Sequence, residues 1–252
     1  SYTSSMSYTV YGTTICGHHG PAPVHRRPRE VHPHTVADEL QGSDSWQRAR
    51  RPSQKRSREQ SILNACKELI SSIHPSDLNT SMIAKEAEIS PSGLYRYYPT
   101  KESILFALYC QDLKNFSLRI RKTSKKIETK FEFAQHYCEC LFEEPRLSLL
   151  MSILGSTIER EIPVDFLIEF KVKSFSSYDE IADFGLHHGA VQSKQEGIEM
   201  IWDINFYVMG LYPIAHGSEN VNEAMKDERL GHYTLNFEEK VRDYVRRLTL
   251  SD

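Results

Sequence analysis

The residues whose types and spacing best suit a chemical task lie between positions 90 and 97, where the chain reads Ser-Pro-Ser-Gly-Leu-Tyr-Arg-Tyr. Pro91 favours the first position of a helix, where its missing N–H would have no partner in any case. The small residues around it allow the first turn to approach a base or a backbone closely. Tyr95 and Tyr97 then carry hydroxyls that can reach phosphate oxygens or base edges. The pattern predicts a short helix suited to the major groove of DNA.

Further helices are expected to position this segment. A first helix is predicted over about 54–71, because four apolar residues recur there at helical spacing: Ile62, Cys66, Leu69 and Ile73. Asn79 or Thr80 can cap a second helix of about two turns, and a tight turn at 88–90 follows it. Thr100 can cap a fourth helix from Lys101 to about Asn115. Two short helices joined by a tight turn, flanked by positive charge, predict a helix-turn-helix.

The charge of the chain is divided between its parts. Residues 48–130 hold 17 Lys and Arg against 8 Asp and Glu, whereas residues 131–252 hold 11 against 22. This asymmetry predicts a module that faces a polyanion, joined to a module with another task. Six basic residues precede or open the first helix: Arg48, Arg50, Arg51, Lys55, Arg56 and Arg58. They can contact phosphate or the minor groove, or they can be a solvated run of charge.

We expect three domains, with boundaries after residues 53 and 111. Residues 1–53 are rich in Ser, Pro and His and predict a leader or extension without a stable core, apart from a short helix over 36–48. Residues 54–111 form the helix-turn-helix domain. Residues 112–252 predict an all-helical regulatory domain with helices over 131–144, 147–160, 164–187 and 196–216 and a last amphipathic stripe from Phe237 to Leu248. The fold class is therefore all-α.

Several functions are excluded by what the sequence lacks. No nucleophile elbow, phosphate loop, HExxH or paired-carboxylate constellation is present, so no enzyme and no cofactor are expected. His187 and His188 point about 100° apart on a helix, and no metal site is predicted. The longest apolar stretch, 206–215, is too short to span a membrane. The five cysteines form no CxxC pair, which is typical of reduced thiols in a cytoplasm.

Residues 83–105 resemble the DNA-binding signature of TetR-type transcriptional regulators. The agreement lies in Ile83-Ala84, Ile89-Ser90, Leu94-Tyr95, Tyr97-Tyr98 and Thr100-Lys101-Glu102 at fixed spacing, and it extends over about 58–110. The resemblance implies that Thr80 caps the second helix and touches phosphate. It also implies that the small residues and Tyr95 lie against bases or backbone, and that Tyr97 and Lys101 grip phosphate. The resulting set of DNA-binding residues is Thr80, Ser81, Ser90, Pro91, Ser92, Gly93, Tyr95, Arg96, Tyr97 and Lys101.

One position departs from the family pattern. Glu88 stands in the turn where the family usually has glycine. Either Glu88 adopts a positive φ, at a cost of roughly 1 kcal/mol, or it keeps an ordinary conformation in a slightly altered turn.

The resemblance further implies a homodimer and a pocket for a small molecule in the regulatory domain. Aromatic and related side chains that could line the pocket, or could equally form the core, are Tyr109, Phe116, His136, Tyr137, Met151, Phe170, Tyr178, Trp202 and Phe206. Residues of the last two long helices that could form the dimer interface are Trp202, Tyr207, Phe237, Val241, Tyr244, Val245 and Leu248. Asp203 and Asn205 interrupt an apolar run and could bind an effector, bond across the dimer or face solvent.

Together, these expectations predict a homodimeric repressor that binds a palindromic operator and that a small-molecule effector releases from it. The fourth helix would carry the coupling, because it joins the reading module to the pocket. An effector-independent activator and a protein-interaction module with a degenerate helix-turn-helix remain as alternatives.

Overall fold

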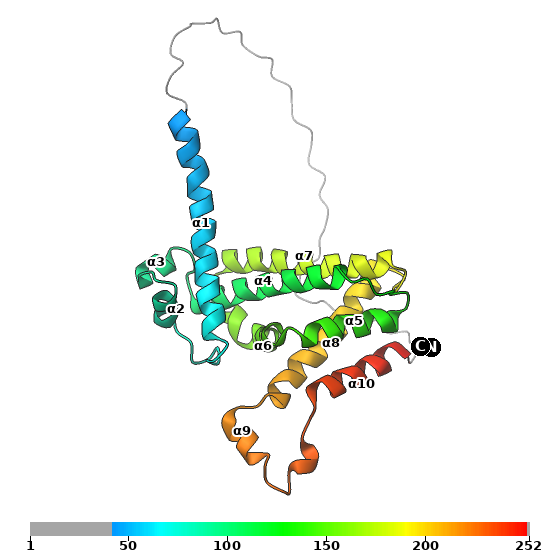
Figure 1. Cartoon of the computed structure of the whole chain (residues 1–252). Coiled ribbons are helices and arrows are strands. Elements are labelled where there is room, and N and C mark those ends of the chain that lie inside the picture. Colours follow the sequence, from blue (N-terminus) through cyan, green and yellow to red (C-terminus); the bar gives the residue numbers. More distant parts are fainter. Residues whose placement is uncertain (1–41, 251–252) are drawn as a thin grey trace, which may run out of the picture. The chain divides into compact units, whose positions relative to one another are not determined.

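The computed structural model describes residues 42–250, with side chains from Ser53 onward, and the chain divides into two units at residues 47 and 48. The description below concerns the second unit, residues 48–252. Most of the predicted leader lies outside the described residues. Its last part is the beginning of α1, Gly42–Leu69, so the boundary expected at residue 53 falls inside a helix (Figure 1).

The helices α2 (Thr80–Glu86) and α3 (Pro91–Tyr95) are each fixed by a side-chain cap. Asn79 Oδ1 accepts from the backbone N–H of Met82 at 3.0 Å, and Ser90 Oγ accepts from that of Gly93 at 3.1 Å. The capping residue of α2 is therefore Asn79, not Thr80, which is already helical. Apolar residues of α1, α2 and α3 form a common core that contains Ile62, Cys66, Leu78, Ile83, Leu94 and Tyr98.

The helix α4 (Lys101–Arg121) is the central element of the C-terminal helical domain. Thr100 caps it by accepting from the N–H of Ser103 at 3.0 Å. We predicted an end near residue 115, and the helix is longer. The reason is that Leu113, Phe116 and Ile120 continue its fully buried face. Helices α4 and α7 lie side by side over much of their length (Figure 1).

The remaining elements largely follow the predicted order. They are α5 (Lys130–Phe142), α6 (Pro145–Ser152), a π-helical turn (Leu154–Ile158), a 3-10 turn (Glu159–Glu161), α7 (Val164–His187), α8 (Lys194–Ala215), α9 (Glu219–Ala224), a 3-10 turn (Gly231–Tyr233) and α10 (Phe237–Leu250). The bounds of α7 are those predicted. The single helix expected over 147–160 is wrong, since α6 ends at Ser152 and a π-helical turn follows. Ile153 and Leu154, at the junction of α6 and the π-helical turn, are half-buried.

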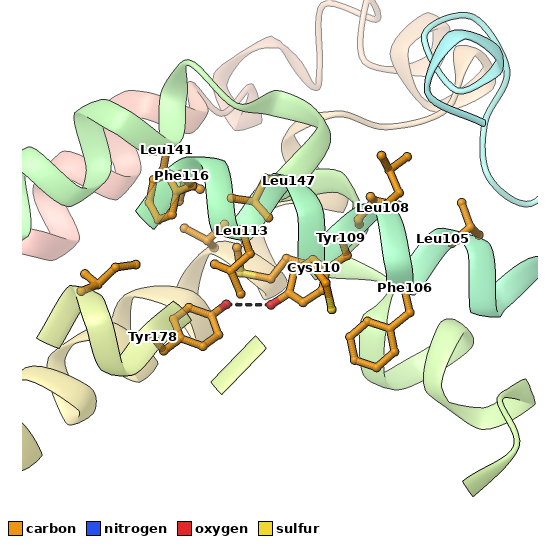
Figure 2. Close-up of a cluster of buried hydrophobic side chains, with 14 of the residues drawn as sticks. Leu105, Phe106, Leu108, Tyr109, Cys110, Leu113, Phe116, Leu141, Leu147 and Tyr178 are labelled. Atoms are coloured by element: carbon orange, nitrogen blue, oxygen red, sulfur yellow. Dashed lines mark hydrogen bonds between the residues drawn. The ribbon is translucent and has the colours of Figure 1, made fainter. Parts of the chain in front are cut away.

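The core of the C-terminal helical domain gathers around α4 (Figure 2). Tyr109, Phe116, Tyr137 and Leu113 are at most 2% exposed. Within residues 42–250 there is no β-strand, which agrees with the predicted all-α class. No helix in that range is long and apolar enough to cross a membrane.

Candidate nucleic-acid interface and the helices attached to it

The predicted reading helix α3 presents its small first turn to solvent. Ser90, Pro91 and Ser92 are exposed, and Gly93 is half-buried. The Ser90 hydroxyl lies 3.1 Å from both the N–H of Gly93 and the hydroxyl of Ser92. A Cβ at position 93 would stand only 3.1 Å from Ser90 Oγ. Gly93 therefore leaves room for the cap of its own helix.

Tyr95 and Thr80 join the two helices of the motif on their exposed side. The Tyr95 side chain is 51% exposed, and its hydroxyl lies 3.0 Å from Thr80 Oγ1. Ser81 and Arg96 are exposed as well, whereas Tyr97 is half-buried and packs against the core. Tyr95 and Thr80, both predicted to face DNA, thus lie together on the exposed side of the motif, whereas Tyr97 turns toward the core.

Lys101 has more internal contacts than a free phosphate ligand needs. Its side chain is 20% exposed and lies 3.6 Å from Glu102 Oε1. Its Nζ donates to the backbone carbonyl of Pro75 at 3.2 Å. The ammonium group therefore ties the start of α4 to the loop that precedes α2, a role that the sequence did not indicate.

Glu88 has a φ of 53°, the only positive φ of a non-glycine residue among the described residues. The alternative of an ordinary conformation is therefore wrong. The Glu88 N–H donates to Lys85 O at 3.1 Å and the Ile89 N–H to Ala84 O at 3.0 Å. These two bonds form a Schellman motif, in which the residue at the Glu88 position is left-handed and usually glycine. The family's turn is kept with a residue that fits it poorly.

The basic residues that open α1 are described only in part. Lys55, Arg56 and Arg58 are exposed, and Lys55 Nζ lies 3.8 Å from Glu59 in the next turn. Arg48, Arg50 and Arg51 precede Ser53, from which the structure describes side chains. A groove of about 920 Å³ includes Lys55, Arg56 and Arg96 in its walls, and the walls continue to Lys173 on α7.

The helix α4 is fastened to its neighbours by charged contacts. Asp112 is 4% exposed and accepts two hydrogen bonds of 2.7 Å from the Arg146 guanidinium on α6. Glu180 on α7 accepts from Lys114 at 2.5 Å and from Ser117 at 3.0 Å. The pair of Asp112 and Arg146 was missed at the sequence level, although an acid on an otherwise apolar helix face was a signal for it.

The predicted pocket residues fall into separate groups. The hydroxyls of Tyr109 and Tyr178 lie 2.7 Å apart, and a dashed line marks this contact in Figure 2. The Tyr137 hydroxyl donates to Asn205 Oδ1 at 2.7 Å. Burial raises the pKa of Tyr178 to about 12 and those of Tyr109 and Tyr137 well above their usual value. Asn205 is 1% exposed; its Nδ2 has no hydrogen-bond partner within 3.5 Å, although the amide lies close enough to the Tyr178 hydroxyl to offset part of the rise in the Tyr178 pKa.

The other pocket candidates surround this group or lie away from it. Phe116 packs edge-on against Tyr137, Phe170 packs on Phe106, and Met151 is buried in the same core. Trp202 is half-buried and contacts Tyr178. Phe206 is 53% exposed, so its assignment to an internal pocket is wrong. The neighbouring residue Asn205, and not Phe206, is the one whose side chain lies in the core.

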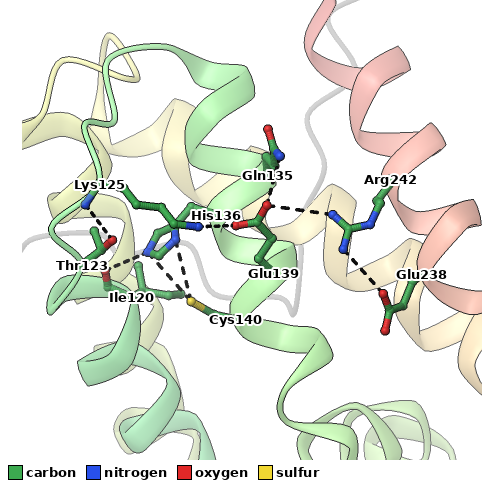
Figure 3. Close-up of polar contacts among 9 residues, drawn as sticks. All are labelled: Ile120, Thr123, Lys125, Gln135, His136, Glu139, Cys140, Glu238 and Arg242. Atoms are coloured by element: carbon green, nitrogen blue, oxygen red, sulfur yellow. Dashed lines mark hydrogen bonds and ion pairs between the residues drawn. The ribbon is translucent and has the colours of Figure 1, made fainter.

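His136 faces a different part of the domain (Figure 3). Its Nε2 lies 3.0 Å from Ile120 O, and both ring nitrogens lie 3.9 Å from Cys140 Sγ. Beside it, Glu139 accepts from Lys125 at 2.7 Å, which lowers the pKa of the Glu139 carboxyl. Arg242 of α10 lies 4.0 Å from Glu139. His136 is therefore buried against α4, next to a surface cluster in which Glu139, not His136, joins α5 to α10.

The predicted dimer residues of α10 mostly pack inside their own subunit. Val241 and Val245 are 0% and 2% exposed and belong to the core, so they cannot form an interface between subunits as they stand. Phe237 contacts Phe142 and Tyr212 edge-on. The amphipathic stripe was interpreted correctly as a packing face, but its partners are α5 and α8 of the same chain.

The other predicted dimer residues are partly accessible. Tyr207 and Tyr244 stack on each other with ring centroids 4.1 Å apart. Trp202 and Leu248 are half-buried. The exposed face of α8 runs beside them and holds Phe206, Gly210 and Ile214, of which Phe206 and Ile214 are 53% and 67% exposed.

The exposed reading helix, its capped partner and the helical domain behind them define a helix-turn-helix regulator. A family model described as "Bacterial regulatory proteins, tetR family" matches residues 62–108, and one described as "Tetracyclin repressor-like, C-terminal domain" matches residues 110–250. The chain therefore belongs to the TetR family of DNA-binding transcriptional regulators. No functionally curated protein matches the sequence.

Solved structures agree in fold at low identity. A TetR transcriptional regulator from Rhodococcus sp. RHA1 is 14% identical, with 77% of this chain and 97% of that chain covered and a TM-score of 0.51. The TetR family repressor AlkX from Dietzia sp. strain DQ12-45-1b is 15% identical, covering 76% and 97%, with a TM-score of 0.44. FadR from Bacillus subtilis, solved with stearoyl-CoA, is 18% identical, covering 74% and 96%, with a TM-score of 0.43. The likeness to the Rhodococcus regulator, at 14% identity, concerns the fold alone.

Proposed function

We propose that the protein is a homodimeric repressor that binds a palindromic operator and is released from it by a small molecule. The observation that carries this proposal is the exposed first turn of α3, joined through one unbroken α4 to a core with an unpartnered amide. Two such helices, held about 34 Å apart by a two-fold axis, would enter successive major grooves. Ser90, Ser92 and Tyr95 would lie nearest the bases, while Arg96 and Lys101 would contact phosphate.

The DNA arm of the proposal is tested by selecting duplexes from a random pool and then measuring affinity by fluorescence anisotropy. Tyr95→Ala should weaken binding to the selected operator by about 1–3 kcal/mol, because it removes a contact at a base edge. Tyr95→Phe separates the hydroxyl from the ring. Lys226→Ala, just after α9, is the control, because it removes an exposed positive charge far along the chain from α3 and should leave operator affinity unchanged. Unchanged operator affinity of Tyr95→Ala would place the reading surface elsewhere.

We place the dimer interface on the exposed face of α8. Phe206 and Ile214 supply apolar area. A Cβ placed at Gly210 would have no other atom within 4 Å, so the space beside this glycine is open and a second helix could approach closely there. A glycine inside a helix costs roughly 1 kcal/mol relative to alanine, and close approach would offset that cost. Phe206→Glu should give monomers in sedimentation equilibrium, whereas Val221→Glu on α9, an exposed apolar residue outside the face, should not. A dimer that survives Phe206→Glu would move the interface.

We place the effector site at the buried group of Tyr109, Tyr137, Tyr178 and Asn205. An apolar molecule with a hydrogen-bond acceptor would fit the free N–H donors of Asn205 Nδ2, because a buried donor without a partner costs about 1–3 kcal/mol. Coupling between such a site and DNA is typically about 1–3 kcal/mol. A thermal-shift screen on the intact chain and on Asn205→Leu should find compounds that stabilise only the former. Compounds that stabilise both equally would act outside this site.

A further inference from the structure

A groove between the reading module and the helical domain lies outside the proposed effector site. Its volume is about 920 Å³, and ligand sites typically have about 300–1,000 Å³. Its walls come from α1, the residues just after α3, α4 and α7 (Figure 1). None of the four residues assigned to the effector site lines it. A molecule in this groove would contact both parts of the chain.

The charge of the groove is mainly positive. Five Lys and Arg residues and two Glu residues line it: Lys55, Arg56, Arg96, Lys114, Lys173, Glu59 and Glu169. Glu59 lies 3.8 Å from Lys55, one turn earlier on α1. Glu169 lies 2.6 Å from Lys173, one turn later on α7. Both carboxylates of the groove are therefore already matched by a lysine of their own helix.

Two guanidinium groups supply the positive charge that remains. Arg56 and Arg96 are exposed, and within the described residues neither guanidinium group makes a hydrogen bond or an ion pair. The last cation of the groove, Lys114, is bound to Glu180 at 2.5 Å. A guanidinium group can bind a carboxylate through two parallel hydrogen bonds. The groove thus offers an anion two accessible arginines.

The groove also has accessible apolar surface. Val172 on α7 is 64% exposed. Phe166 on the same helix and Tyr97 after α3 are half-buried, and all three side chains line the groove. A flat aromatic ring can pack against such side chains, stacked or edge-to-face. Covering Val172 would also remove apolar surface from water.

The polar groups between these two regions already bond to one another. Gln111 Nε2 on α4 donates to Gln60 Oε1 on α1 at 2.8 Å. The Ser177 hydroxyl donates to Lys173 O at 3.3 Å. The polar group of a ligand is therefore expected at the two arginines, and its apolar part beside α7.

From these features we infer that the groove between α1, α4 and α7 binds a flat aromatic carboxylate. Arg56 and Arg96 hold the carboxylate, and the ring lies against Val172, Phe166 and Tyr97. The inference shares Arg96 with the proposed DNA contact, but it does not rest on the proposed function. Its test uses the chain without DNA, so either proposal can fail while the other stands.

The test compares 2-naphthoate with 2-naphthamide on the intact chain by isothermal titration calorimetry. The two molecules have nearly the same shape, and only 2-naphthoate is charged at neutral pH. We expect saturable binding of 2-naphthoate that is about fivefold tighter than that of the amide, the size of a well-formed exposed ion pair. Arg56→Gln and Arg96→Gln should each bring the affinity for 2-naphthoate close to that for the amide. Arg58→Gln is the matched control, because Arg58 is an exposed arginine of α1 outside the groove, and it should change neither affinity.

A second pair of variants fixes the location of the ring. Val172→Glu places a carboxylate in the groove and should weaken 2-naphthoate binding by about tenfold or more, through repulsion and loss of apolar contact. Val164→Glu makes the same change two turns earlier on α7, at a residue that is 68% exposed and outside the groove, and should leave binding unchanged. Both side chains are exposed, so both variants should melt near the temperature of the parent chain.

Asn205→Leu distinguishes the groove from the buried core, and it should bind 2-naphthoate as the parent chain does. The inference is overturned by absence of saturable 2-naphthoate binding, by equal affinity for the acid and the amide, or by equal affinity of the parent chain and the two arginine variants. Loss of binding in Asn205→Leu with retention in Val172→Glu would also overturn it, because the ligand would then occupy the core.

Discussion

Replacing Glu88 by glycine should make this protein more stable. Glu88 occupies the left-handed position of the Schellman motif that ends α2, with φ 53°. A side chain at such a position costs about 1–2 kcal/mol. Glycine removes that cost but loses about 0.4–1 kcal/mol through the greater freedom of the unfolded chain. The net gain should be about 0.5–1 kcal/mol, which raises the melting temperature of a chain of this size by about 1–4 °C.

Two matched variants separate the backbone from the charge. Glu88→Ala removes the carboxylate and keeps the Cβ, so it should not gain the stability that Glu88→Gly gains. Glu86→Gly makes the same substitution two residues earlier, at an ordinary helical position, and should lose about 1 kcal/mol. Differential scanning calorimetry and guanidinium unfolding measure all three. If Glu88→Gly is no more stable than Glu88→Ala, the strain assigned to this turn is absent and the reasoning fails.

Three further predictions concern charge and burial. Lys101→Ala should weaken binding to every DNA sequence and lower the slope of log affinity against log salt by about one, as anisotropy titrations would show; an unchanged slope would mean that Lys101 serves only its contacts with Pro75 and Glu102. Asp112→Asn should lower the free energy of unfolding in urea by about 1–3 kcal/mol, because the Arg146 guanidinium loses its bidentate carboxylate partner. The control is Glu169→Gln, which breaks the exposed pair of Glu169 and Lys173. A smaller loss of stability in Asp112→Asn than in this control would contradict the prediction. Stability should fall above pH 9, because burial raises the pKa of the Cys66 and Cys138 thiols from 9.0 to about 12. The native state then holds these protons more tightly than the unfolded state. The stability that each thiol contributes is therefore fully present below pH 9, and it falls by about 1.4 kcal/mol per pH unit between pH 9 and pH 12. Urea unfolding of Cys138→Ala between pH 8 and pH 10 should show a smaller fall of stability with pH than the parent chain, by the contribution of one thiol. An equal fall in the two chains would contradict the raised pKa of Cys138.

The sequence predicted the local features of the reading module well, because they depend on neighbouring residues. Pro91 at a helix start, the buried Leu94 and the cap at Thr100 each follow from a few adjacent positions. The bounds of α7 were likewise predictable from helical spacing. Where two capping residues were adjacent, as at Asn79 and Thr80, the sequence left both open and only the geometry chose Asn79.

The sequence did not predict which surfaces pack within one subunit. An apolar stripe such as Val241 and Val245 looks the same whether it faces its own chain or a second copy, because burial removes apolar surface from water equally in both cases. Phe206 was assigned to the interior and lies outside for the same reason. The Asp112–Arg146 pair joins helices 34 positions apart in sequence, and no local pattern brings its two members together.

The unbroken course of α4 has a mechanical consequence. Its 21 residues extend for about 30 Å at about 1.5 Å per residue, with the reading module at one end and the Glu180 contacts at the other. A stiff lever of this length magnifies a small rotation, so a tilt of about 5° at its far end would carry Lys101 through about 3 Å. In a two-fold assembly both levers would swing together, and a change too slight to disturb the packing of either subunit could put the two reading helices out of step with the DNA repeat.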